Sequence, residues 1–136
     1  MTWPGLRWGP VAGAAAVPSL VEPDGSFLRT TRETLERARP EHVEIELRAQ
    51  IERALEAGID VTHLDAHMGT ALLPPLGTLY AALARHYRLP VFAVRPDQAA
   101  LRAAGVPGAA GFFAALATEL AQRRVDIPLD ALPLLN

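Results

Sequence analysis

The chain has 136 residues, with 13 basic and 15 acidic side chains and a formal net charge of −2 at pH 7. This length is that of one domain, and we assign residues 1–136 to a single domain. A small negative charge provides no basic field for a phosphate backbone, which argues against nucleic acid as a partner. The absence of cysteine excludes disulfides, thiolate metal sites and a cysteine nucleophile.

The sequence also argues against membrane contact. No apolar run approaches the roughly 18 residues that a membrane-spanning helix needs. The first residues lack the charged-then-apolar order of a secretory signal. We therefore expect a cytoplasmic protein.

Residues 1–38 are predicted to form a proline-rich loop segment. Prolines recur at positions 4, 10, 18 and 23, and each one fixes φ and removes a backbone donor. The residues Glu22-Pro23-Asp24-Gly25 have the composition of a tight turn. Trp3 and Trp8 lie in this segment, where they could stack on a sugar or serve packing.

A helix is predicted from about Pro40 to Ala57. Proline suits the first helical turn, and Gly58 stands where a left-handed cap belongs. Apolar residues at steps of four make one stripe, which is expected to face a core. The stripe consists of Val43, Leu47, Ile51 and Leu55.

Strand-like and helix-like segments alternate through residues 39–136. After the first helix we predict a β-rich run at 59–67, a helix at Pro75–His86, a strand at 89–96, and helices near 97–104 and 109–124. This alternation indicates βα units and a parallel sheet. The predicted fold is therefore α/β, either an incomplete β/α barrel or a small open parallel sheet flanked by helices.

Three potential ligands, His63, Asp65 and His67, stand close together in the 59–67 run. Side chains alternate faces along an extended strand, so all three are expected on one side. Burying two imidazoles and a carboxylate on one face removes their hydration, and this free-energy cost must be offset by new interactions. A divalent ion such as zinc or magnesium would supply them, and so would a hydrogen-bonded network around a substrate.

Strand geometry limits the metal interpretation. Neighbours on one face lie roughly 6.6 Å apart, twice the rise per residue. We therefore expect one residue to bind the metal and the others to orient it or line the pocket. Because α/β sheets place their sites at the C-terminal ends of strands, His67 is the preferred ligand. Arg95 ends the next strand, where it could pair with a substrate or simply meet solvent.

The segment Thr62-His63-Leu64-Asp65-Ala66-His67 resembles the Thr-His-Leu-Asp-Ser-His motif of the YdjC-like (ChbG-like) carbohydrate deacetylases. Other matching runs occur in the same order along the chain. They are Arg7-Trp8-Gly9-Pro10, Val17-Pro18-Ser19-Leu20, Asp24-Gly25-Ser26-Phe27, Glu46-Leu47-Arg48-Ala49-Gln50-Ile51 and Val94-Arg95-Pro96. The similarity covers most of the chain and corresponds to the middle portion of the family.

The resemblance implies a metal-dependent hydrolase that removes acetyl groups from N-acetylated sugars on a distorted β/α barrel. Family members bind a divalent metal, Mg²⁺ or Zn²⁺, through an Asp, a His and the last His of the motif. Here only that last His has a counterpart, His67. His63, Asp65 and Arg95 would support the pocket, and no catalytic residue is assigned. Ala66 stands where the family has Ser.

The resemblance also predicts that the chain is a truncated form. The family's Asp-Asp motif and first ligand His would precede Trp3, and we expect the chain alone to bind metal weakly. We keep as an alternative a non-catalytic remnant with a binding or structural role. Unpaired strand edges on an incomplete barrel lead us to expect a homo-oligomer.

Overall fold

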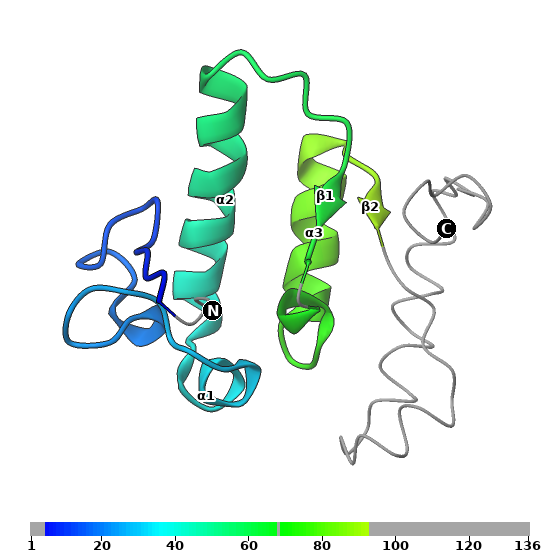
Figure 1. The fold of residues 1–136 in the computed structure, drawn as a ribbon. Coiled ribbons are helices and arrows are strands. Elements are labelled where there is room, and N and C mark those ends of the chain that lie inside the picture. Colours follow the sequence, from blue (N-terminus) through cyan, green and yellow to red (C-terminus); the bar gives the residue numbers. More distant parts are fainter. Residues whose placement is uncertain (1–4, 68, 93–136) are drawn as a thin grey trace, which may run out of the picture.

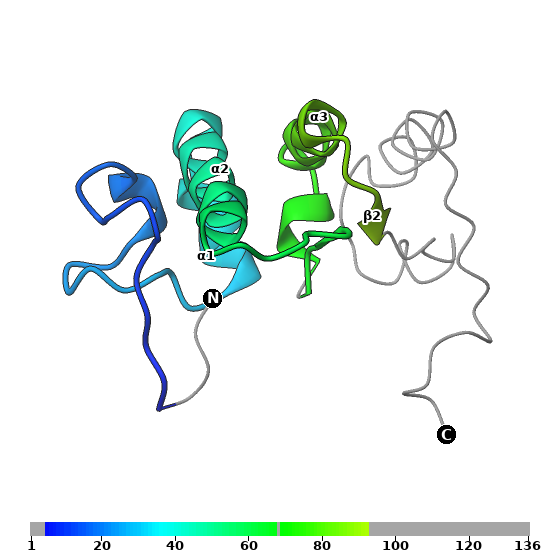
Figure 2. The same cartoon turned by 90° about the horizontal axis from the view of Figure 1, so that it is seen from above.

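The computed structural model describes residues 5–67 and 69–92 of the chain. Two helices, α2 (Pro40–Glu56) and α3 (Gly77–Tyr87), lie side by side. Most of the segment that precedes them lies on the side of α2 away from α3, and its last part, α1 (Thr31–Arg37), lies beside the start of α2 (Figures 1 and 2). Within the described ranges, no helix has the length and apolar character needed to cross a membrane.

The segment before the helices is mostly loop, as predicted, and contains the expected turn. Gly25 has a φ of 80°, and the Asp24 carboxylate accepts hydrogen bonds from the Ser26 N–H at 3.1 Å and the Ser26 hydroxyl at 2.7 Å. A short 3-10 helix, η1 (Pro18–Leu20), precedes an isolated antiparallel bridge between Val21 and Phe27. These contacts fold the segment back on itself.

The prediction of loop as far as residue 38 is wrong for helix α1 (Thr31–Arg37). Thr30 caps this helix, because its hydroxyl accepts the Glu33 N–H at 3.1 Å while Glu33 Oε2 accepts the Thr30 N–H at 3.0 Å. This reciprocal pair is a capping box, and its Thr-x-x-Glu signature is present in the sequence. The prolines before residue 30 favour loop and mask this signal.

Helix α2 has the predicted start and ends one residue before the predicted end. Gly58 takes a φ of 75° and follows Ala57, the C-cap residue of the helix. Two members of the predicted stripe, Val43 and Ile51, are buried, but Leu55 is 46% exposed. Glu46 is buried instead, at 3% exposure, so the helix turns a carboxylate toward the interior.

A β-α-β unit follows α2. Strand β1 (Leu64–Asp65) pairs in parallel with β2 (Val91–Phe92), with Leu64 opposite Val91, and α3 connects the two. Strand β1 is shorter than the predicted run at 59–67, and residues 93–96 of the second predicted strand lie outside the described residues. Helix α3 agrees with the predicted helix within two residues at its start. A barrel beyond this pair stays a prediction. The predicted helices at 97–104 and 109–124 lie outside the described residues.

The core lies where the first segment meets the two long helices. Its buried cluster joins four side chains from three parts of the chain. They are Val17, Leu20, Val43 and Leu76. Because these residues are far apart in sequence, burying them holds the first segment, α2 and the start of α3 together.

Candidate functional site

A cavity of about 300 Å³ opens between the first segment, α2, the end of β1 and the start of α3. Its lining is mostly apolar, with a few polar groups. The residues are Trp8, Leu20, Phe27, Leu28, Thr34, Val43, Glu46, Leu47, Gln50, Asp65, Ala66, His67, Thr70, Ala71, Leu76 and Tyr80. Apolar walls with a small number of polar groups are typical of small-molecule sites.

Asp65 and His67 lie together in this lining. Asp65 is the last residue of β1, and its Oδ2 lies 3.7 Å from Nδ1 of His67. Both side chains keep solvent access, at 44% and 80%. With Nδ1 facing the carboxylate, Nε2 is the ring nitrogen available to a ligand. The role of Asp65 as a support for a metal-binding His67 stays a prediction.

His63 does not line the cavity. Its side chain is exposed, and Nδ1 lies 2.9 Å from the hydroxyl of Thr62. Strand β1 begins only at Leu64, so the alternation that would align His63 with Asp65 is not held by strand pairing. Arg95, the other predicted pocket residue, lies outside the described residues. The roles of His63 and Arg95 in the site stay predictions.

The carboxylate of Glu46 holds the first segment against the cavity. Its two oxygens accept the backbone N–H groups of Val11 and Ala12, each at 3.0 Å, and Oε1 also accepts from Gln50 Nε2 at 2.6 Å. Three donors therefore satisfy the oxygens of this buried carboxylate. This contact anchors the residues that follow Trp8, whose half-exposed ring lines the cavity. Sequence reasoning placed Glu46 in a matching motif but assigned it no contact.

Tyr80, on α3, lines the cavity and is only 5% exposed. Its hydroxyl is buried and finds no hydrogen-bond partner among the described residues. Burial, and secondly the negative charge of Asp65, raise the pKa of this hydroxyl well above its usual range. The group is therefore a protonated donor at neutral pH. Tyr80 lies in the predicted helix Pro75–His86, and no sequence motif marks it as a site residue.

The described residues supply few ligands for a metal. In residues 5–67 and 69–92, no three side chains of His, Asp or Glu gather closely enough to hold an ion. The donor set at the end of β1 is one imidazole and one carboxylate, both suited to a divalent ion. His67 with Asp65 therefore fits part of a metal site.

The comparisons with known proteins agree with the resemblance seen in the sequence. A family model described as YdjC-like protein matches residues 5–130. A carbohydrate deacetylase of Brevibacillus brevis is 41% identical over 75 residues, which are 55% of this chain and 30% of that protein. A carbohydrate deacetylase of Thermus thermophilus is 40% identical over 87 residues, 64% of this chain and 31% of that protein.

A third carbohydrate deacetylase, from Geobacillus stearothermophilus, is 42% identical over 81 residues, 60% of this chain and 33% of that protein. The chain spans about a third of the length of the curated relatives it matches. The family model, by contrast, covers nearly the whole chain, and this confirms the family assignment made from the motif. The chain belongs to the YdjC-like family.

Proposed function

We propose that the protein is a metal-dependent hydrolase that removes acetyl groups from N-acetylated carbohydrates. The relatives named above carry the name carbohydrate deacetylase, which supports this substrate class. The observation that carries the proposal is the position of Asp65 and His67, which stand together at the C-terminal end of β1 and line one cavity. We further propose that β1 and β2 belong to a β/α barrel, whose sites lie at this end of the strands.

His67 would bind the divalent ion through Nε2, because its Nδ1 faces Asp65. A carboxylate beside a metal-binding imidazole fixes the ring's orientation and raises its basicity, which is the part we propose for Asp65. Catalytic zinc sites take three protein ligands, so donors other than this pair would complete the site. When bound, a divalent ion lowers the pKa of a coordinated water, which makes a nucleophile for an amide carbonyl available at neutral pH.

The remaining lining suits a carbohydrate. Trp8 presents a half-exposed ring at the cavity, and a flat aromatic face stacks well on the C–H face of a sugar. Apolar side chains such as Leu20 and Leu76 exclude water from the interior of the cavity. Exclusion of water strengthens the electrostatic contacts made inside it.

The test is acetate release from N-acetylglucosamine oligomers by the full chain at saturating Zn²⁺ or Mg²⁺. Release that depends on the metal and that His67→Ala abolishes would support the hydrolase. His86→Ala serves as the matched control, since His86 is exposed on α3 and does not line the cavity. Its activity should equal that of the unchanged chain.

The alternative is a non-catalytic protein that keeps the site for binding. It is favoured by the small number of metal donors in the described residues. Binding of the sugar at saturating metal without any acetate release would support this alternative and exclude the hydrolase. Loss of activity in both histidine variants would also count against a specific role for His67.

A further inference from the structure

Tyr80 carries the single buried side-chain polar atom without a hydrogen-bond partner in the described part of the chain. Leaving a buried donor unpaired destabilises a protein by about 1–3 kcal/mol, so such a group needs an explanation. Phenylalanine would fill the same space without this penalty. Within residues 5–67 and 69–92 the hydroxyl is therefore unfavourable for folding alone, which points to a partner outside these residues.

The surroundings of Tyr80 define what that partner is. The ring lines the same cavity as Asp65 and His67, and Leu20 and Leu76 also belong to the lining. A ligand reaching the Tyr80 ring must offer an acceptor oxygen to the hydroxyl. It must also be uncharged there, because an anion would be buried among apolar groups and face the carboxylate of Asp65.

A carbonyl oxygen next to a small apolar group meets both conditions. We infer that the Tyr80 hydroxyl donates a hydrogen bond to the acyl carbonyl oxygen of an N-acetylated sugar, whose methyl group packs against Leu20 and Leu76. This inference rests on the proposed function and adds the residue that recognises the acetyl group. Tyr80 thereby distinguishes an N-acetylated sugar from the free amine, which has no carbonyl for this hydroxyl.

The experiment compares Tyr80→Phe with the unchanged 136-residue chain. The probes are N-acetylglucosamine and glucosamine, each titrated and followed by NMR. Removing one hydrogen bond of ordinary strength should weaken N-acetylglucosamine binding about three- to tenfold. Binding of glucosamine should stay unchanged, so the preference for the acetylated sugar should fall by the same factor.

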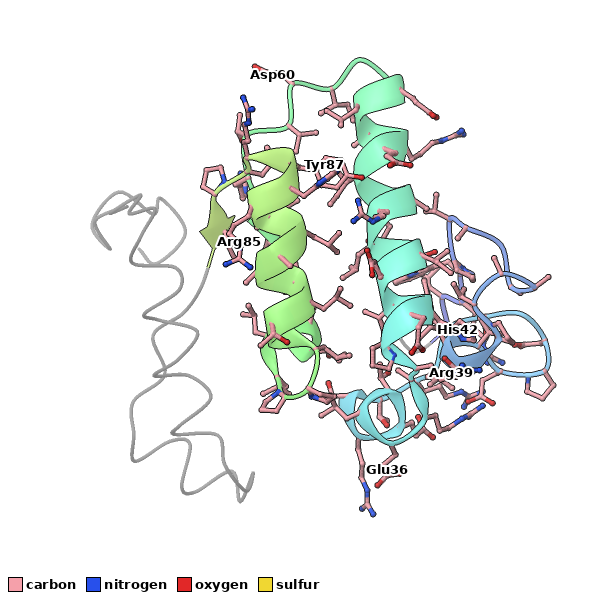
Figure 3. The ribbon with its side chains drawn as sticks, turned by 180° about the vertical axis from the view of Figure 1, so that it is seen from behind. Glu36, Arg39, His42, Asp60, Arg85 and Tyr87 are labelled. Carbon is pink, nitrogen blue, oxygen red and sulfur yellow. The ribbon has the colours of Figure 1, made fainter. Side chains whose placement is uncertain are left out.

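Tyr87→Phe is the matched control on the same helix. Its hydroxyl donates to Glu52 Oε1 at 2.8 Å and lies outside the cavity lining (Figure 3). Sugar binding should be unchanged in this variant. Urea unfolding without sugar provides a second readout: Tyr80→Phe should be as stable as the unchanged chain or more stable, because the unpaired donor is gone.

The outcomes separate this inference from the proposed function. Equal N-acetylglucosamine affinity in Tyr80→Phe and the unchanged chain overturns the role of Tyr80 and leaves the proposed function standing. A marked loss of stability in Tyr80→Phe also overturns it, because the hydroxyl would then have a structural partner. Failure of the unchanged chain to bind either sugar overturns the proposed function, and the inference with it.

Discussion

The hydroxyl of Tyr87 donates a hydrogen bond of 2.8 Å to Oε1 of Glu52, which joins the last turn of α3 to α2 (Figure 3). The guanidinium of Arg48, one turn earlier on α2, lies 5.9 Å from the centre of the Tyr87 ring. These contacts tie together the C-terminal halves of the two helices, while the cavity lies toward their N-terminal halves. The two tyrosines of α3 therefore differ, since Tyr87 has a partner in the folded chain.

Tyr87→Phe should lower the free energy of unfolding by about 0.5–1 kcal/mol, the net value of one hydrogen bond near the surface. Tyr80→Phe should not lower it. Urea unfolding of both variants at pH 7 measures the contrast. Equal destabilisation of the two variants would contradict the assignment of the partnered and unpartnered hydroxyls.

Glu46→Gln should destabilise the chain by about 1–3 kcal/mol. The two carboxylate oxygens of Glu46 accept the N–H groups of Val11 and Ala12, and in glutamine one of these oxygens is replaced by an NH2 group, which would face a backbone N–H without bonding to it. The matched control is Glu44→Gln on the same helix. Glu44 pairs with Arg48 at 2.9 Å but is 42% exposed, so its loss should cost less than about 0.5 kcal/mol. Denaturant unfolding gives both values, and similar losses in the two variants would argue against a special role for Glu46.

Thr30→Ala should destabilise α1 by about 1 kcal/mol, since the capping hydroxyl that accepts the Glu33 N–H is lost. Thr30→Ser retains an acceptor and should keep most of this stability. Circular dichroism during urea unfolding checks the pair. If the alanine variant matched the serine variant, the capping box would contribute nothing to the fold.

Zinc should bind weakly to the chain, with a dissociation constant above the micromolar range, because the described residues bring only His67 and Asp65 to the site, fewer than the three protein ligands of a catalytic zinc site. His67→Ala should remove the binding, whereas His63→Ala should leave it unchanged, because His63 does not line the cavity. Isothermal titration calorimetry measures all three proteins. A micromolar or tighter affinity that His67→Ala removes would show that further donors take part.

Stability should fall as the pH rises above about 10. Burial, followed by the charge of Asp65, raises the pKa of Tyr80 in the folded chain, so the unfolded chain loses this proton first. Increasing pH therefore favours the unfolded state. The contribution of the protonated Tyr80 hydroxyl to stability is present below the pKa of an unfolded tyrosine and is lost as the pH rises toward the raised pKa of Tyr80 in the folded chain. Unfolding measured between pH 8 and 11 should show a shallower decline in Tyr80→Phe than in the unchanged chain.

Local signals in the sequence were sufficient for α2 and α3. Pro40 at the first turn and Gly58 after the last one bound α2 within one residue, because these two residue types act on the backbone where they stand. The motif that ends at His67 identified the family, which the family model confirms. Helix α1 also has a local signal, the capping box of Thr30 and Glu33, but the prolines that precede it favour a loop.

Tertiary structure alone decided how the cavity is built. Nothing local to Glu46 or Val11 indicates that a buried carboxylate on α2 binds a backbone 35 residues earlier. The period of two likewise placed His63 with Asp65 and His67, but β1 is only two residues long, so pairing does not enforce that period at His63. Which polar groups share one cavity depends on contacts between distant segments, and a sequence pattern reports only on neighbours along the chain.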